Sequence, residues 1–249
     1  MPLPQSVRLG FAAALAAASL IVGPHEARSE TGEWSRPFTA PPSASWIEAG
    51  DAGLAPSNPR RLEPVAGRGV LMSFYRGEYD DRNLLSDENY GDCEVHLEFM
   101  LSKGSNAGVK MHGLYEIQLR DSHGIAKPKA TDCGGVYPRA ELKPRYRTID
   151  EGTPPLVNAA RPAGEWQTLE IRFRTPRFDE SGTKTASAVF EEVRLNGQVV
   201  QRGAVVDYPT GANWRKLQSP VGPLFLQGDH GPVAYRNVRI RALPAADGD

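Results

Sequence analysis

Apolar and polar residues alternate in several short runs along the chain, and a period of two is typical of β-strands with one buried face. In the run 93–101, every second residue is apolar, and two glutamates and a histidine lie between them. In the run 115–120, Tyr115, Ile117 and Leu119 form the apolar side. We therefore expect a half-buried strand in each such run. The other runs are 70–75, 108–112, 168–174, 188–200, 223–227 and 233–243.

The turns between the runs indicate the same fold class. Asn196-Gly197 separates two apolar runs, and this dipeptide favours the type I′ turn of a two-residue hairpin. No window keeps a helical period for three turns, and residues 121–164 contain many Gly and Pro with no clear period. Short strands with turn residues between them are typical of a single all-β domain. The sequence therefore predicts a two-sheet antiparallel β-sandwich of the jelly-roll type.

Charge and composition exclude several classes of protein. The 249 residues include 29 Lys and Arg and 30 Asp and Glu, so the formal net charge is −1. Binding to a phosphate backbone needs a concentrated positive field, which argues against a nucleic acid as partner. With 40% hydrophobic residues, the chain is too apolar for intrinsic disorder. A chain of this length also buries enough surface to fold without a metal or a disulfide.

The N-terminal segment has the features of a secretory signal. Residues 9–22 carry no charge, Pro24 follows them, and Ala27 and Ser29 are small residues two apart that suit cleavage before Glu30. This uncharged stretch is too short for a membrane span, which needs about 20 residues. We expect a signal peptide over 1–29, a secreted or periplasmic protein, and no stable membrane span after cleavage. The alternative is an uncleaved N-terminal anchor.

Composition divides the rest of the chain into three parts. Residues 30–65 are rich in Pro and Ala, and we expect a lead-in there with little regular structure. Residues 66–243 contain nearly all the strand patterns and form the predicted sandwich domain. Residues 244–249 form a C-terminal tail.

Both cysteines, Cys93 and Cys133, lie in the part that we expect to be exported, where an oxidising compartment would allow them to pair. Cys93, however, lies on the apolar side of its predicted strand, and a buried free thiol is an equally ordinary arrangement. Both interpretations stay open. The two cysteines do not have the spacing of a zinc site.

The segment 115–123 carries the densest group of side chains that could perform chemistry. Glu116 and Gln118 share the outward side of the predicted strand, which we expect to be exposed, and a bulge after Leu119 would bring Asp121 to the same side. Hydrolysis of a glycoside by two carboxylates needs them about 5–9 Å apart, and the central amide of Gln118 does not fit that mechanism well. The alternative is a strand whose polar residues serve solubility alone.

Histidines add further candidates. Asp121 and His123, with His112 one strand away, could be metal ligands or a proton-transfer pair, although a single histidine is more often simply hydrogen bonded. His230 lies between two predicted strands, and Asn106 is a common turn residue, so both also fit ordinary turns.

Eight short motifs follow one another in order over residues 66–243. They are Tyr90-Gly91-Asp92-Cys93-Glu94, Ser105-Asn106-Ala107-Gly108-Val109, Tyr115-Glu116-Ile117-Gln118 followed by Asp121-Ser122, Gly134-Gly135-Val136-Tyr137, Gly164-Glu165-Trp166-Gln167, Leu195-Asn196-Gly197, Leu226-Gln227-Gly228-Asp229-His230-Gly231 and Tyr235-Arg236-Asn237-Val238. Each is weak alone, but together they make the chain resemble the 3-keto-disaccharide hydrolase domain family, also described as a 3-keto-glucoside 1,2-lyase and 3-keto-2-hydroxy-glucal hydratase domain. That family is similar in fold to the concanavalin A-like lectins and glucanases.

The resemblance implies a reaction on sugars that carry a ketone at C3. A base removes the acidified C2 proton, the C1 aglycone leaves by β-elimination, and water can add back. It implies Glu116 or Asp121 as the base, with His123 and His230 as proton carriers. A divalent cation of unknown identity on Glu116, Asp121 and His123 could stabilise the enolate. No organic cofactor is expected.

The resemblance also implies a set of residues that bind the carbohydrate substrate. They are Asn106, Lys110, His112, Gln118, Tyr137 and Gln227. Lys110 and His112 stand where more usual members of the family have other residues. The rival interpretation is a carbohydrate-binding module of the same fold that performs no chemistry. Its stacking platforms for sugar rings would be Trp166, Trp214, Tyr137 and Tyr146.

Overall fold

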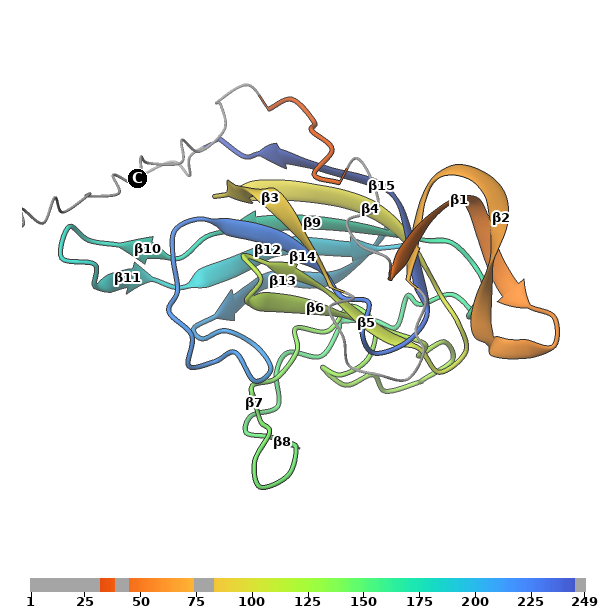
Figure 1. Ribbon diagram of the computed structural model, residues 1–249. Helices are drawn as coiled ribbons and strands as arrows, with labels where there is room; N and C mark the ends of the chain where they lie inside the picture. The colour runs from red at the N-terminus through yellow and green to blue at the C-terminus, as the bar shows by residue number, and fades with distance from the viewer. Residues whose placement is uncertain (1–31, 39–44, 74–82, 245–249) are drawn as a thin grey trace, which may run out of the picture.

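A computed structural model of the protein describes residues 32–38, 45–73 and 83–244, and Figure 1 shows how its strands form two layers. The larger sheet has seven strands in the order β1-β2-β15-β4-β9-β12-β13, and the smaller sheet has four in the order β3-β14-β5-β6. The pairings within both sheets are antiparallel. The predicted two-sheet antiparallel β-sandwich is therefore confirmed.

The larger sheet is built from β1 (Trp46–Ala55), β2 (Asn58–Ser73), β15 (Val233–Ala242), β4 (Cys93–Leu101), β9 (Gln167–Arg174), β12 (Ala188–Leu195) and β13 (Gln198–Val206). The smaller sheet is built from β3 (Leu84–Tyr90), β14 (Gly222–Leu226), β5 (Asn106–Met111) and β6 (Tyr115–Arg120). Two short ladders pair β7 (Ala140–Glu141) with β8 (Arg147–Thr148), and β10 (Arg177–Phe178) with β11 (Lys184–Ala186). The part of the chain that the structure describes contains no helix long and apolar enough to cross a membrane.

The apolar sides of the alternating runs fill the space between the two sheets. In β6, Tyr115, Ile117 and Leu119 are fully buried, as the alternation predicts. The ring of Phe173 in β9 lies 5.5 Å from the ring of Tyr115 and 5.2 Å from that of Phe190 in β12, measured between centroids. Aromatic pairs at such distances stabilise a core beyond the area that they bury. This packing determines which side of β6 faces away from the core.

The predicted hairpin after β12 is also confirmed. Asn196 and Gly197 connect β12 to β13, with φ of 52° and 80°. A type I′ turn needs a positive φ at both central positions, and Asn and Gly adopt it at lower cost than other residues.

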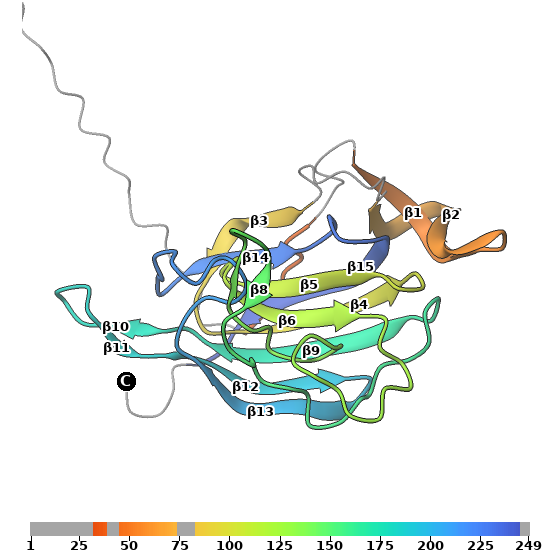
Figure 2. The ribbon, with the colours of Figure 1, turned by 90° about the horizontal axis from the view of Figure 1, so that it is seen from below.

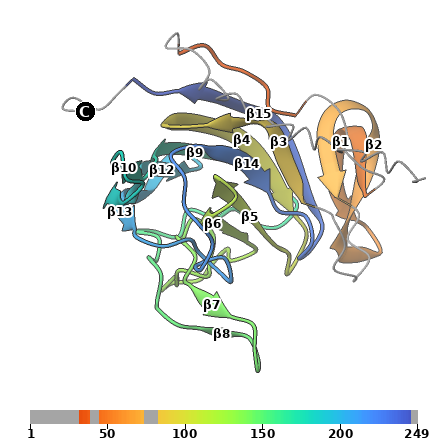
Figure 3. The same cartoon turned by 60° about the vertical axis from the view of Figure 1, so that its left-hand side comes forward.

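The structure differs from the prediction at the N-terminal side of the domain. Residues 46–65, expected to belong to a lead-in with little regular structure, form β1 and the first half of β2. Prolines fit here because, among the described strands, residues 58–65 pair with β1 alone, so their other side donates no ladder hydrogen bonds. Figure 3 shows this β1–β2 ribbon at one end of the main stack. The predicted signal peptide at 1–29 and all but the first residue of the tail at 244–249 lie outside the described residues.

Cys93 and Cys133 are both free and both buried. Of the two interpretations, a disulfide and buried free thiols, the structure contains the second. Cys93 lies on the inner side of β4, and Cys133 lies in the long segment after β6. Burial raises the pKa of both thiols, which keeps them in the unreactive protonated form at neutral pH.

The Gly- and Pro-rich segment after β6 extends the smaller sheet. The backbone NH of Gln118 donates to the carbonyl of Gly135 at 2.9 Å, and the NH of Gly134 donates to the carbonyl of Gln118 at 2.8 Å. An isolated bridge joins Ile117 to Val136. The chain then forms the β7–β8 hairpin, and in Figure 2 its strand β8 lies in front of β14, β5 and β6. Because this segment is held by single bridges and turns, it has no strand long enough to produce an alternation of apolar and polar residues. This explains why its sequence shows no clear period.

Candidate functional site

The register of β14, β5 and β6 places polar candidates together on the outer face of the smaller sheet. Lys110 of β5 pairs with Glu116 of β6 on one side and with Phe225 of β14 on the other. In the next row, Gly108 of β5 pairs with Gln118 of β6. Residues in one such row lie on the same face of a sheet, so their side chains can interact.

Glu116 and Lys110 form a buried ion pair. Nζ of Lys110 lies 3.3 Å from Oε2 of Glu116, and the two residues are only 9% and 5% exposed. The ammonium also lies 5.0 Å from the centroid of the Phe225 ring, a cation–π distance. The prediction that Glu116 lies on an exposed face is therefore wrong. The face points away from the core, but loops that follow β6 and β14 lie against it.

Gly108 provides the space for the Glu116 carboxylate. A Cβ atom at residue 108 would lie 2.3 Å from Oε1 of Glu116 and 3.0 Å from its Cδ. Only a glycine therefore leaves the carboxylate room beside β5. The sequence showed Gly108 as one residue of a motif, and its physical reason appears only when β5 and β6 are paired.

Burial and charge act in opposite directions on the pKa of Glu116. Burial is the largest influence and raises the pKa. The ammonium of Lys110 and the imidazole of His230 lower it, while the carboxylate of Asp229 raises it. The net result is a pKa above the ordinary value for a glutamate. Such a carboxylate is a stronger proton acceptor, which suits a general base.

The loop 227–231 brings His230 to the same place. The NH of Gln227 donates to the carbonyl of Gly108 at 2.9 Å, so Gln227 continues the row of Gly108 and Gln118. The hydroxyl of Tyr235 donates to the carbonyl of Gln227 at 3.0 Å. Nε2 of Gln227 lies 3.0 Å from Nδ1 of His230. Strand β14 and its hydrogen bonds to β5 thus position this histidine.

Asp229 and Asn83 surround the other side of His230. Oδ1 of Asp229 lies 2.5 Å from Nδ1 of His230, and Oδ2 accepts a hydrogen bond from Nδ2 of Asn83 at 3.0 Å. In the sequence, Asp229 stands out only as part of a motif. Asn83 gave no signal at all, because 146 residues separate it from Asp229 in the chain.

Gln118 and Asn106 are hydrogen bonded to each other beside Glu116. Nε2 of Gln118 donates to Oδ1 of Asn106 at 2.9 Å and to the carbonyl of Thr131 at 3.3 Å. Gln118 is buried and Asn106 is half-buried. Amides held in this way offer fixed donors and acceptors to a polar ligand.

Tyr137 borders the group from the segment after β6. Its NH donates to the carbonyl of Glu116 at 3.0 Å. Its hydroxyl is hydrogen bonded to that of Tyr146, which is 52% exposed in the connection between β7 and β8. Burial, helped by Tyr146 and by the charge of Glu116, raises the pKa of Tyr137, so its hydroxyl keeps its proton.

The structure thus brings most of the sequence-predicted site residues to one face of the smaller sheet. The residues of this candidate group are Asn106, Lys110, Glu116, Gln118, Tyr137, Gln227 and His230.

Asp121 and His123 lie outside the candidate group. The expected bulge is absent from the described ladder, because β5 and β6 pair without a register shift. Oδ2 of Asp121 instead accepts a hydrogen bond from the NH of Gly104 at 2.8 Å, in the turn before β5. Nδ1 of His123 donates to the carbonyl of Ala160 at 2.8 Å, because a carbonyl oxygen only accepts. Both side chains therefore serve loop structure.

The three residues expected to hold a divalent cation do not come together. Within the described ranges, no group of three or more His, Cys, Asp or Glu side chains could hold a metal ion. The donor set that the sequence suggested on Glu116, Asp121 and His123 therefore does not fit a cation. The positive charge beside Glu116 comes from Lys110.

His112 lies in the core, which corrects the expectation that it contacts the substrate. Its ring faces those of Phe173 and Tyr115 at 5.3 and 6.1 Å between centroids. Neither ring nitrogen has a hydrogen-bond partner among the described residues, and burial lowers the pKa of His112 to about 4. Its φ of 55° ends the alternation of β5, so the side chain turns inward instead of lying beside Lys110.

Thr210 supports Glu116 and gave no signal in the sequence. Its Oγ1 accepts a hydrogen bond from the NH of Glu116 at 3.1 Å and donates to the carbonyl of Leu114 at 3.0 Å. The two residues are 94 positions apart, so only the fold brings them together. This hydroxyl holds the start of β6 in place.

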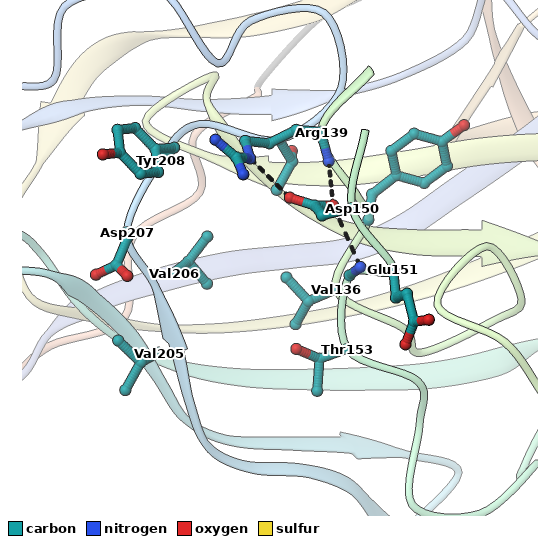
Figure 4. Close-up of a pocket in the computed structure, with 12 residues that line it drawn as sticks. Val136, Arg139, Asp150, Glu151, Thr153, Val205, Val206, Asp207 and Tyr208 are labelled. Carbon is teal, nitrogen blue, oxygen red and sulfur yellow. Dashed lines mark hydrogen bonds and ion pairs between the residues drawn. The ribbon is translucent and has the colours of Figure 1, made fainter. Parts of the chain in front are cut away.

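A pocket of about 290 Å³ lies next to the candidate group, between the end of β13 and the segment after β6 (Figure 4). Nε of Arg139 and Oδ2 of Asp150 form an ion pair at 2.7 Å within its lining. Tyr137 and Thr210 also line it, whereas Glu116 does not. The pocket and the candidate group are therefore neighbours that share a wall.

Three crystal structures from Parabacteroides distasonis ATCC 8503, each described as a "putative glycosyl hydrolase", resemble this fold. One has a TM-score of 0.56 at 20% identity and covers 84% of either chain. A second has a TM-score of 0.53 at 21% identity and covers 85% of this chain and 100% of that one. A third has a TM-score of 0.52 at 14% identity and covers 85% and 94%. At these identities the likeness establishes the fold alone. No curated protein matches the sequence.

A family model extends the comparison from the fold to the sequence. The model of the 3-keto-alpha-glucoside-1,2-lyase-like domain matches residues 47–241, a range that includes the β1–β2 ribbon except Trp46 and the whole candidate group. This match confirms the resemblance drawn from the eight motifs. The chain therefore belongs to the 3-keto-alpha-glucoside-1,2-lyase-like domain family.

Proposed function

We propose that this protein cleaves 3-keto-glycosides by β-elimination, with Glu116 as the base that removes the C2 proton. The observation that carries the proposal is the buried ion pair of Glu116 and Lys110 on the outer face of the smaller sheet. Family membership supports the substrate class. The pair supplies what that chemistry needs, a proton acceptor of raised pKa beside a positive charge.

The reaction begins at C2, whose proton is acidic because its removal next to the C3 ketone gives an enolate. The Glu116 carboxylate takes the proton, and the C2–H electron pair forms a C2=C3 bond while the C3 oxygen gains the negative charge. The C3 carbonyl then re-forms, a C1=C2 bond forms, and the bond from C1 to the aglycone oxygen breaks. His230, in its imidazolium form, gives that oxygen a proton. Water then adds across C1=C2: protonated Glu116 returns its proton to C2, and neutral His230 takes a proton from the water that bonds to C1, which completes a net hydrolysis and restores both groups.

Lys110 acts on the charge that develops during the first step. Its ammonium stabilises the negative C3 oxygen of the enolate, and the buried setting strengthens this attraction relative to bulk water. Gln118, Gln227 and Asn106 hold the sugar hydroxyls. Their amide groups lie in adjacent rows of the same face and are fixed by hydrogen bonds, so they orient the ring with C2 toward Glu116.

The substitution Glu116→Gln tests the base. The amide keeps the size of the side chain but removes the proton acceptor, and positioned general bases contribute about 10²–10⁴-fold to rate. We expect a loss of that order in kcat for aglycone release from a 3-keto-glucoside. Because Lys110 then lacks its buried partner, the variant should also be less stable by about 1–3 kcal/mol, so its melting temperature must first show that it is folded in the assay.

Asp121→Asn is the matched control. It makes the same chemical change five residues along the chain, where the carboxylate serves the turn at Gly104. We expect Asp121→Asn to keep the parent rate. A parent rate in Glu116→Gln, or an equal loss in both variants, would remove Glu116 as the base.

A binding module without chemistry is the second candidate, and the half-exposed Tyr146 at the rim of the group favours it. Arginines lie over the rings of two of its expected platforms, because Arg236 lies 4.0 Å from the ring centroid of Trp166 and Arg215 lies 4.3 Å from that of Trp214. A parent protein that binds a 3-keto-glucoside but releases no aglycone would establish this second function.

A further inference from the structure

We propose that Asp229 is a positioning residue for His230. It keeps a proton on Nδ1 in both charge states of the imidazole, so that the second proton of the imidazolium, on Nε2, is the one given to the departing aglycone. This inference rests on the proposed function for its chemical purpose. The arrangement itself rests on geometry that does not depend on any substrate.

Both oxygens of the Asp229 carboxylate are engaged. Oδ1 lies 2.5 Å from Nδ1 of His230, and Oδ2 accepts a hydrogen bond from Nδ2 of Asn83 at 3.0 Å. Oδ1 of Asn83 in turn accepts a hydrogen bond from the NH of Gly228 at 3.1 Å. Asn83 precedes β3 and Gly228 follows β14, two strands that are paired in the smaller sheet. The carboxylate is therefore attached to a rigid part of the fold.

The contact with Asp229 decides the tautomer of His230. A carboxylate only accepts hydrogen bonds, so a contact this short with Nδ1 requires the proton on Nδ1. Gln227 must then present its amide oxygen to the same N–H, because its Nε2 would be a second donor at 3.0 Å. With Nδ1 committed in this way, Nε2 is the nitrogen through which His230 takes up and releases a proton.

Asp229 stays charged in this setting, which the positioning requires. Burial raises the pKa of Asp229, but the hydrogen bonds with His230 and Asn83 together lower it by more. The net pKa therefore lies below the usual range for an aspartate. Among the described residues, the charge of Asp229 also acts on Glu116 and Tyr235. Burial raises the pKa of Tyr235, so this hydroxyl remains neutral and Asp229 is the anion in contact with the imidazole.

When the His230 imidazolium has given its Nε2 proton to the aglycone, a neutral imidazole remains. Without Asp229 both neutral tautomers would be populated, and only the Nδ1–H tautomer has an unprotonated Nε2 that can take a proton back from the water that adds across C1=C2. An arrangement of this kind, in which a carboxylate fixes a histidine that transfers protons, loses about 10⁴-fold in kcat when the carboxylate becomes an amide in the serine protease triad. Here the histidine acts in one of the two proton transfers of the elimination. We therefore expect a smaller loss, about 10²-fold, for Asp229→Asn.

The first arm of the test measures the tautomer directly. Imidazole ¹⁵N spectra of the uniformly labelled protein are recorded at about pH 9, where histidines are ordinarily neutral, and the His230 signals are assigned by their loss in His230→Gln. We expect the Nδ1–H form in the parent protein and a mixture of forms in Asp229→Asn. Asn83→Ala loosens the same loop but keeps the carboxylate, and should keep the Nδ1–H form.

The second arm measures turnover in a double-mutant cycle. If Asp229 acts through His230, Asp229→Asn should lower kcat about 10²-fold in the parent with little change in KM, and should have no further effect in His230→Gln. An unchanged tautomer in Asp229→Asn, or a loss of kcat that is equally large in His230→Gln, would overturn the inference. A parent protein inactive on 3-keto-glucosides would overturn the proposed function, while the spectra would still decide the role of Asp229.

Discussion

At Glu116, burial and the neighbouring charge act in opposite directions on the pKa of the carboxyl group. Burial alone would leave the side chain protonated and unable to accept a proton, whereas an exposed ion pair with Lys110 would hold it as a weak base. The structure combines a buried position with one adjacent ammonium, so the pKa is raised and the charge of the ionised form is still compensated. If Glu116 is the base of the proposed reaction, we expect Lys110 to influence the pH at which the site works.

The substitution Lys110→Met tests this balance. Methionine keeps the packing against Phe225 but removes the ammonium that lowers the pKa of Glu116, so that pKa should rise further. Because the base acts in its deprotonated form, the acidic limb of kcat/KM against pH should move to higher pH. The plateau should also fall by about 10²-fold, since the enolate loses its positive partner.

Lys110→Arg is the control for that experiment, because it keeps the charge. Its acidic limb should stay close to that of the parent protein. An acidic limb that does not move in Lys110→Met would show that Lys110 does not influence the base.

At the scale of the elements, a period of two was enough to find most strands and to assign the two sides of β6. That information is local, since each side chain alternates with its own neighbours. The burial of Glu116 is not local. It depends on two loops, one after β6 and one after β14, and on the side-chain space left by Gly108 across the ladder. For the same reason the prolines of β2 were misleading, because their tolerance depends on which strand lies opposite.

The residues of the candidate site likewise divide into those that a local pattern or motif reveals and those that only the fold brings together. Glu116 and Gln118 were found because they alternate along one strand, and His230 was found through a family motif. Asn83 and Thr210 were missed, since each reaches the site from a distant part of the chain. Asp121 was assigned to the group on a bulge that the described β5–β6 ladder does not contain.

The pairing of β5 with β6 makes a prediction for Gly108→Ala. The added methyl group would lie 2.3 Å from Oε1 of Glu116, so the carboxylate must leave its place beside Lys110. We expect a loss of about 1–3 kcal/mol in stability from overpacking. The loss of turnover should approach that of Glu116→Gln. Thermal unfolding and kcat for aglycone release measure the two effects.

Gly53→Ala is the matched control, because a Cβ at residue 53 in β1 meets nothing within 4 Å. It should leave both quantities unchanged. Full activity in Gly108→Ala would mean that the carboxylate can act from another position, and that the close fit on β5 has no functional purpose.

At the scale of the whole molecule, the two sheets have different outer faces. On the larger sheet, cross-strand ion pairs join β15 to β4, with Arg236 at 2.7 Å from Glu98 and Arg241 at 2.6 Å from Glu94. On the smaller sheet, the segment after β6 and the loop after β14 lie against the candidate group. The sandwich thus serves as a rigid base on one side and as a platform for a site on the other, which is how loops on stable scaffolds usually carry function.

The first thirty residues and the two cysteines lead to a prediction about the compartment of this protein. We propose export directed by the uncharged segment 9–22, with the mature chain beginning near Glu30. An oxidising compartment would endanger accessible thiols, but Cys93 and Cys133 are both fully buried, and burial raises the pKa of Cys133 to about 12. The folded protein should therefore keep two free thiols after export.

Protein recovered from the periplasm or medium of its native host provides both measurements. N-terminal sequencing should begin near residue 30, and a thiol reagent should find no reactive cysteine in the native protein and two in denaturant without reductant. An intact Met1 in the membrane fraction would contradict export. Fewer than two thiols in denaturant would mean that the exported protein is oxidised at one or both cysteines, and that their burial does not protect them.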